Sequence, residues 1–258
     1  MINTLVRLCL AAGLVWVAHL APATSAAAQD AAAVDAQVKR LEGFIASTPQ
    51  AGIARALEEG FPDEYATFRV RMREIATAGG NMGPPLGQAF EALQATVRQR
   101  YSLLSRRVPA AEREKQLAYM LHTFETVKAH SPGDCAFVAS AGPEEGARFN
   151  RFMATDNPIR TMRLDGIELR FRMLAAARGN AVEAGELTAA DNEAVMRAFQ
   201  AAGKALGHEA KTVTAVIERT SPKEPSGAPL CDLGAALFKS LSTLPADVRY
   251  RFLSTIVP

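Results

Sequence analysis

Residues 62–104 read PDEYATFRVRMREIATAGGNMGPPLGQAFEALQATVRQRYSLL. The apolar residues of this stretch recur three and four positions apart, which is the spacing of one face of an α-helix. Glycines and prolines at 79–85 interrupt the pattern once, so the stretch predicts two consecutive amphipathic helices. The two apolar series are Tyr65, Phe68, Met72 and Ile75, followed by Leu86, Phe90, Leu93, Val97, Tyr101 and Leu104.

The same helical spacing extends through the rest of the chain. A third strong helix is expected between Pro109 and the loop at 131–133, and Pro158 and Pro245 each fit the first turn of a further helix. Asn157 and Thr188 are plausible helix caps. Three further features are less regular: Gly166 suggests a break, residues 210–218 are β-branched enough to resemble a strand, and a helix is expected at about 231–242. The sequence therefore predicts an all-α, bundle-like array of about eight to ten helices.

The loop at 131–135 divides the chain near its middle. It suggests an N-terminal helical region at 29–130 and a C-terminal helical region at 131–258. A single continuous domain fits the pattern almost as well, because the apolar periodicity does not change at this point.

The first 28 residues have the layout of a secretory signal peptide. Arg7 precedes an apolar run of residues 8–21, and small residues then lead to cleavage between Ala28 and Gln29. The alternative is an uncleaved membrane anchor. The run is shorter than the roughly 20 apolar residues that a spanning helix needs, and it contains His19. Charges interrupt every later apolar run, so no membrane span is expected in the mature chain. We expect a periplasmic or secreted protein.

Removal of that segment takes away Cys9 and leaves Cys135 and Cys231. An even number of cysteines in an oxidising compartment favours a disulfide, here one within the C-terminal half. It would close a loop of roughly 100 residues, a length that the chain-entropy model associates with about 4–5 kcal/mol of stability. The alternative is two buried, unpaired thiols.

The net charge and the composition of the chain say little about its function. The whole chain carries 29 basic and 27 acidic residues, and the near balance gives no electrostatic case for nucleic-acid binding. The alanine- and arginine-rich composition together with the leader suggests a bacterial origin. Arginines gather near residues 69–73, 98–107 and 160–172, and we interpret them as solvated helix faces paired with nearby acids.

No catalytic, cofactor-binding or metal-binding residue can be assigned from motifs. His208 and Glu209 begin a zinc-protease motif, but position 212 is Thr, where the second histidine is needed. His122 and Glu125 lie three residues apart on one predicted helix, yet no second Glu-x-x-His pair exists to complete a di-iron bundle. We therefore expect His122 and His130 to be surface or boundary residues.

Three functional hypotheses remain. The first is an exported helical protein that binds a protein partner or an envelope component without catalysing a reaction. The second is a helical envelope hydrolase or lyase that uses a lone glutamate with His122. The third is a membrane-tethered assembly subunit that keeps its N-terminal segment as an anchor. The sequence favours the first, because none of the motifs completes a catalytic site.

Overall fold

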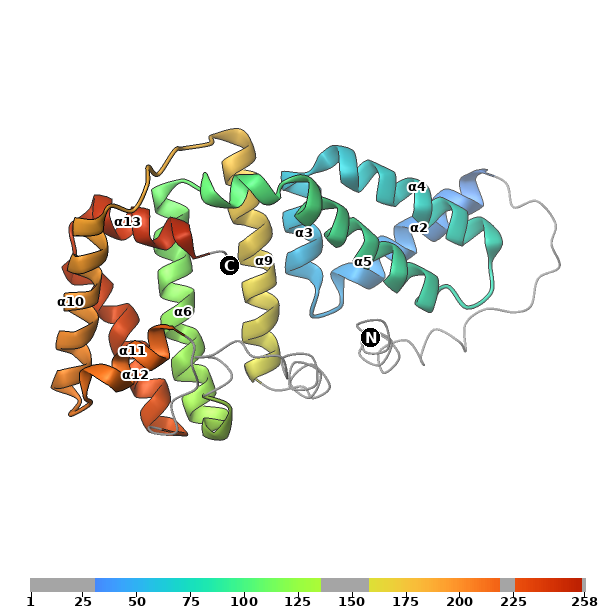
Figure 1. Ribbon diagram of the computed structural model, residues 1–258. Coiled ribbons are helices and arrows are strands. Elements are labelled where there is room, and N and C mark those ends of the chain that lie inside the picture. Colours follow the sequence, from blue (N-terminus) through green and yellow to red (C-terminus); the bar gives the residue numbers. More distant parts are fainter. Residues whose placement is uncertain (1–30, 136–157, 219–225, 257–258) are drawn as a thin grey trace. The chain divides into compact units, whose positions relative to one another are not determined.

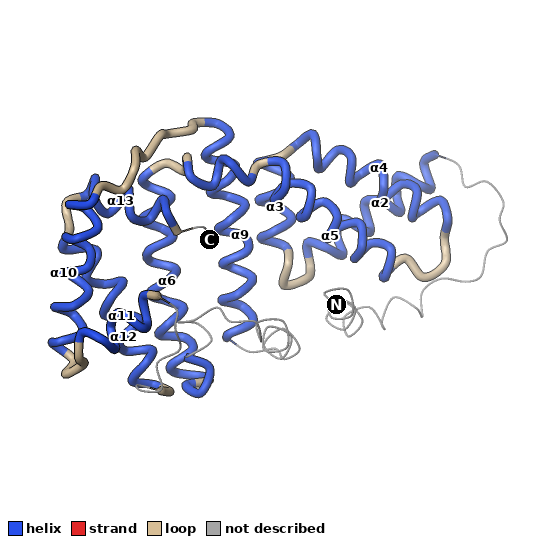
Figure 2. Tube along the Cα trace, viewed as in Figure 1, coloured by secondary structure: helices blue, strands red, loops and turns tan. Residues whose placement is uncertain are grey.

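The computed structural model describes residues 31–135, 158–218 and 226–256, and every regular element in these ranges is helical (Figures 1 and 2). Ten α-helices and three short 3₁₀ helices are present there, with no strand, so the all-α prediction is confirmed. The expected signal peptide, its Ala28–Gln29 cleavage position and the cap at Asn157 lie outside the described residues.

The described chain divides into two compact units, with the boundary between Ser102 and Leu103. The first unit contains four helices: α2 (Ala31–Ala46), α3 (Ala51–Gly60), α4 (Pro62–Ala78) and α5 (Gly83–Arg100). Helix α4 packs on both α2 and α5. The two apolar series predicted from the sequence lie in α4 and α5 and form the core of this unit. All of their members except Tyr101 and Leu104 are buried.

The break between α4 and α5 follows from two glycines. Gly79 and Gly80 have φ values of 65° and 74°, in the left-handed region where a Cβ atom is disfavoured. Helix α5 then begins at Gly83 and carries prolines in its first turn, where the missing N–H groups would have no helical partner. The break predicted at residues 79–85 is therefore confirmed.

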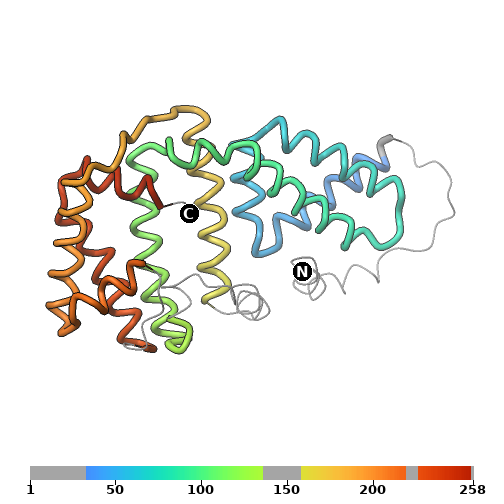
Figure 3. The backbone as a smooth tube through the Cα atoms, viewed as in Figure 1, coloured from blue at the N-terminus to red at the C-terminus, as the bar shows by residue number. Residues whose placement is uncertain are grey.

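The second unit is built around α6 (Ala110–His130) and α12 (Ala228–Ser240), which pack against each other. The C-terminal helix α13 returns to lie beside α6, although the two are far apart in the sequence (Figure 3). The remaining elements are η3 (Ser102–Arg106), which begins at the boundary, η4 (Pro132–Asp134), α9 (Pro158–Gly179), α10 (Ala189–Ala205), α11 (Ala210–Ile217), η5 (Leu241–Thr243) and α13 (Ala246–Thr255).

The boundary between the units differs in position from the division suggested by the loop at 131–135. Helix α6 belongs to the second unit because its apolar face is covered by α12: Phe124 is 4 % exposed and stacks on Phe238, with the ring centroids 5.8 Å apart. A tertiary contact of this kind, between residues more than a hundred positions apart, leaves no local mark in the sequence.

Two local expectations need correction, and one ambiguity is resolved. Helix α9 continues through Gly166 and does not break there. The glycine is needed for packing: a Cβ atom at this position would come within 2.2 Å of the Tyr119 hydroxyl of α6. The glycine makes room for a neighbouring side chain. Residues 210–217 form helix α11 and not a strand. Helix α12 begins at Ala228, three residues earlier than expected.

Glycines provide a matched test of this packing. A Cβ atom at Gly234 would lie 2.3 Å from the buried ring of Phe124, so Gly234→Ala is expected to lower the free energy of unfolding by about 1–3 kcal/mol. Gly43, inside α2, has nothing within 4 Å of its Cβ position, so Gly43→Ala is expected to raise stability by about 0.5–1 kcal/mol. Urea unfolding followed by circular dichroism measures both. Two changes of the same sign would contradict the packing described.

Candidate functional site

Cys135 and Cys231 form a disulfide, as predicted from the cysteine count. Their Cα atoms are 5.2 Å apart, and neither residue is more than 1 % exposed. Cys135 directly follows η4, and Cys231 lies in the first turn of α12, where Gly227 gives the chain a φ of 61° before the helix begins. The bridge is part of the apolar core of the second unit.

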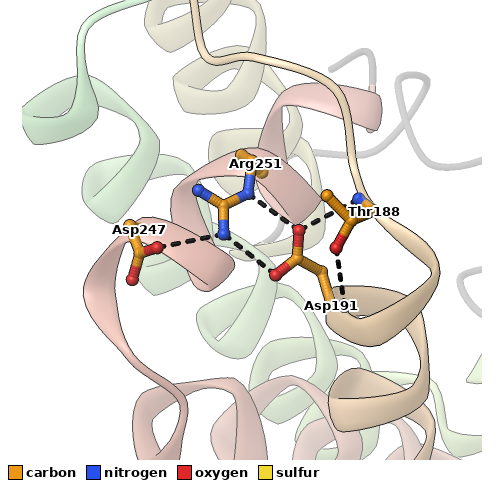
Figure 4. A network of polar contacts seen from close by, with 4 residues as sticks. All are labelled: Thr188, Asp191, Asp247 and Arg251. Atoms are coloured by element: carbon orange, nitrogen blue, oxygen red, sulfur yellow. Dashed lines mark hydrogen bonds and ion pairs between the residues drawn. The ribbon is translucent and has the colours of Figure 1, made fainter.

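A polar cluster joins the beginning of α10 to α13 (Figure 4). The guanidinium of Arg251 donates from Nε to Asp191 Oδ2 and from Nη2 to Asp191 Oδ1, both at 2.9 Å. Asp191 Oδ2 also accepts from the backbone N–H of Thr188 at 3.0 Å, and Thr188 Oγ1 accepts from the Asp191 N–H at 3.1 Å. Arg251 Nη2 reaches Asp247 as well, at 3.0 Å. We call these four residues the Arg251 clamp.

The Arg251 clamp is a structural device and not a reactive centre. Asp191 is 7 % exposed, and both of its carboxylate oxygens accept hydrogen bonds from fixed donors. The hydrogen bonds from Arg251, followed by that from the Thr188 backbone, hold the pKa of Asp191 well below its usual value. The carboxylate therefore stays ionised, caps α10 and fastens α13 to it. Thr188 was predicted as the cap, and this is confirmed.

The pH dependence of stability tests this arrangement. The pKa of Asp191 is lower in the folded protein than the value near 3.9 of an unfolded chain, so its stabilisation is complete above about pH 4 and is lost as the pH falls toward the folded-state pKa. We therefore expect Asp191→Asn to be less stable than the wild type at pH 7. The difference should shrink steadily below pH 4. Urea unfolding at several pH values measures it.

Asp247 provides the matched control for that experiment. It contacts the same guanidinium, but its side chain is 67 % exposed, so solvent screens the interaction. Asp247→Asn should therefore have a smaller effect than Asp191→Asn at pH 7. Equal effects of the two substitutions, or a difference that persists unchanged at pH 2, would contradict the role assigned to Asp191.

Arg113 of α6 is fully buried and is surrounded by neutral acceptors. It donates to the carbonyl of Ser105, to Gln116 Oε1 at 2.7 Å and to the carbonyl of Ile256 at 3.3 Å. Gln116 Nε2 donates to the same Ile256 carbonyl at 3.2 Å. Among the described residues Arg113 makes no ion pair, and burial lowers its pKa to about 10, which keeps it charged at neutral pH. It ties η3 and the end of α13 to α6.

The outer part of the α6–α9 contact gathers several titratable groups. Tyr119 is half-buried, and desolvation by burial is the largest cause that raises its pKa. Asp165 of α9 also has a raised pKa, through partial burial and then the nearby charge of Glu168, while His122 of α6 opposes the shift. His122 is exposed, and its Nε2 atom lies 3.3 Å from Thr126 Oγ1. The exposed side chains of His122 and Asp165 can form hydrogen bonds with a partner at the surface of the second unit.

The histidines and glutamates considered from the sequence are mostly separated. His122, Glu125 and His130 are exposed on α6, as a surface assignment predicts. Glu209 is the exposed residue before α11 and pairs with Lys211 at 2.8 Å. Within the described ranges, no group of three or more His, Cys, Asp or Glu side chains is arranged to hold a metal ion.

The arginines near residues 69–73 lie on solvated helix faces, as interpreted from the sequence. Arg69 bridges Glu42 and Glu58, at 2.8 and 2.9 Å, and thus connects α4 to α2 and α3. Arg71 pairs with Glu74, and Arg73 with Asp35. These exposed pairs contribute modestly to stability.

One carboxylate of the first unit is buried at the end of α5. Glu64 is 5 % exposed, and its Oε1 accepts from Arg100 Nη1 at 2.8 Å and from the Tyr101 hydroxyl at 2.7 Å. The Tyr101 ring packs on Phe61, with the centroids 5.0 Å apart. The acidic side chains in the first turn of α4 suit the helix dipole, and Glu64 has the second role of holding the end of α5.

Comparisons with known proteins add no relationship: no family model, no curated protein and no solved structure matches the chain. Of the helices in the described ranges, none has both the length and the apolar character needed to cross a bilayer.

Proposed function

We propose that the protein is exported and acts in the cell envelope as a disulfide-stabilised helical protein that binds another protein or an envelope component. The observation that carries the proposal is the buried bridge between Cys135 and Cys231. Disulfides of this kind form and persist in oxidising compartments and are rare in the cytosol of most organisms. The leader-like residues 1–28 provide the route to such a compartment.

The polar clusters support a binding role over a catalytic one. The guanidinium groups of Arg251 and Arg113 donate to acceptors within the protein and connect helices. Catalytic acids and bases, by contrast, need an open position for a substrate within hydrogen-bond reach. Polar side chains that remain at the surface, such as His122 and Asp165, are suited to contacts with a partner.

An intact-mass measurement tests export and the bridge together. The full-length chain is expressed with its own leader, the periplasmic fraction is denatured, and free thiols are alkylated before and after reduction. The proposal predicts a chain that begins at Gln29, takes up no alkyl group before reduction and takes up two afterwards. An uncleaved chain would contain Cys9 and would take up one group before reduction and three after it.

The outcomes separate the parts of the proposal. If the uncleaved, bridged chain stays in the membrane fraction after a carbonate wash, the hypothesis of a membrane-tethered subunit would replace that of a cleaved envelope protein. Two alkyl groups before reduction would show that the thiols are unpaired in the cell and would remove the argument for an oxidising compartment. The wild type can instead be tested on a panel of hydrolase substrates. If it turns one of them over, and if His122→Ala abolishes this activity but leaves the circular dichroism spectrum unchanged, catalysis would replace binding as the proposed role.

A further inference from the structure

The longest stretch outside helices in the described residues connects α9 to α10 (Figure 1). We call residues 181–187 of this connection the strap. None of these residues is buried, and they include two exposed glutamates, Glu183 and Glu186. The rest of the strap consists of small or apolar residues.

The first part of the strap is attached weakly. The Val182 N–H donates to the Arg107 carbonyl at 2.9 Å, and the Val182 carbonyl accepts from the Tyr250 hydroxyl at 3.4 Å. Glu183 pairs with Arg107 at 2.5 Å, but the two side chains are 73 % and 50 % exposed, so solvent screens the pair. These contacts can therefore open at little cost.

The second part of the strap has no attachment until α10 begins. Among the described residues, the backbone N–H and carbonyl groups of residues 184–187 have no hydrogen-bond partner. Thr188 then caps α10 and belongs to the Arg251 clamp. Four exposed or half-buried residues thus lie between a weak anchor and a firm one.

A segment of this kind is where folded proteins are cut by endopeptidases. Cleavage concentrates in exposed loops of small and polar residues whose backbone lacks hydrogen bonds. Glu186 is exposed in the unbonded part of the strap, whereas Glu183 is held by Arg107. Of the two glutamates, Glu186 is therefore the more accessible to an endopeptidase that cuts after glutamate.

A cut in the strap would leave the pieces joined. The strap lies between Cys135 and Cys231 in the sequence, and the bridge connects these two residues. The Arg251 clamp would belong entirely to the second piece, which would stay packed on α6 through α12 and α13. The described helices on both sides of the cut would thus keep their contacts.

We propose that the Glu186–Leu187 bond is a site of limited proteolysis, at which a glutamate-specific endopeptidase converts the protein into two chains joined by the Cys135–Cys231 disulfide. Water is the second reactant. The C–N bond breaks, the water oxygen forms the new carboxylate of Glu186, and its hydrogen goes to the new amino group of Leu187. The proposal does not depend on the binding role proposed above.

Digestion of the folded, oxidised full chain with a purified glutamate-specific endopeptidase tests the site. Glu144, Glu145 and Glu224 lie outside the described residues and are first replaced with glutamine, so that every remaining glutamate has a described position. The expected product is one chain that ends at Glu186 and one that begins at Leu187, identified by mass. On a denaturing gel the two should separate only after reduction, and the circular dichroism spectrum should stay unchanged.

Matched glutamates locate the cut. Glu186→Gln should abolish it, whereas Glu183→Gln should leave it in place. Glu209 is also exposed and outside a helix, but the preceding Gly207 and His208 N–H groups donate back to the end of α10 at 2.9 Å. The folded protein should therefore not be cut at Glu209, and the protein unfolded in urea should be.

Three results would overturn the proposal. The first is a folded protein that resists the enzyme while the unfolded protein is digested. The second is a cut that persists in Glu186→Gln, or one that occurs equally fast at Glu209, because either would show that the strap is not selected. The third is a pair of products that separate in denaturant without a reductant, which would contradict the bridged two-chain form.

Discussion

Replacing both Cys135 and Cys231 with alanine is expected to lower the free energy of unfolding of the second unit by several kcal/mol. The bridge spans a sequence separation of 96 residues. For a loop of this length, the chain-entropy model gives about 4–5 kcal/mol, and measured values are often smaller. Urea unfolding of the oxidised wild type and of the double variant, followed by circular dichroism, measures the loss.

The effect should be confined to one part of the chain. Cys135 and Cys231 both belong to the second unit, and the bridge between them is part of its apolar core. Hydrogen exchange should therefore increase in α6, α10 and α12 of the double variant and stay unchanged in α4 and α5. Equal deprotection of both units would show that they unfold together and that the division into two units has no energetic meaning.

Single substitutions separate the covalent link from the packing of the side chains. Cys231→Ser removes the link and leaves a hydroxyl in an apolar core, so it should be at least as destabilising as the double alanine variant. Reduction of the wild type leaves two thiols that still fill the same space, and it should cost less than either variant. A reduced wild type that is less stable than the double alanine variant would contradict this order.

The sequence predicted the helices well because apolar periodicity records which face of each helix is buried. Phe68, Met72, Leu93 and Val97 are all 5 % exposed or less, at the positions that the spacing indicated. Local chemistry was also informative: glycines end α4, and Thr188 caps α10. These signals lie within a few residues of the feature that they determine.

Features that depend on distant residues were missed. Gly166 was expected to break its helix, but it lies within α9 and leaves room for Tyr119 from another helix. The acidic residue in the first turn of α10 is recognisable as a capping residue, but its partner Arg251 lies 60 residues further along the chain. The disulfide is the exception: only Cys135 and Cys231 lie beyond the expected leader, so the predicted pairing has a single solution.

Arg113 could not be distinguished from the other arginines in the sequence, since its neighbours Glu112, Glu114 and Lys115 are typical of a solvated helix. Arg113 lies four residues before the buried Leu117, so it belongs to the apolar face of the helix, where charged residues are rarely buried. Its acceptors come from three places in the chain: Ser105 before the helix, Gln116 within it and Ile256 at the end of α13. Only the folded chain brings these acceptors together.

Arg113→Ala is the second substitution for which a large effect is expected, about 3 kcal/mol or more of unfolding free energy. It removes a fully buried side chain and leaves the Ser105 carbonyl and Gln116 Oε1 without their donor, and each unpaired buried acceptor costs about 1–3 kcal/mol. Arg113→Met keeps most of the volume and removes the cost of burying a cation that has no carboxylate partner among the described residues, so it should be the milder change. Arg55→Ala, at an exposed arginine of α3, should change stability by less than about 0.5 kcal/mol.

Urea unfolding of the three variants measures the order. If Met were as destabilising as Ala, the hydrogen bonds to Ser105 and Ile256, and not the packing, would be what Arg113 contributes; if both were neutral, Arg113 would not hold η3 and α13 to α6.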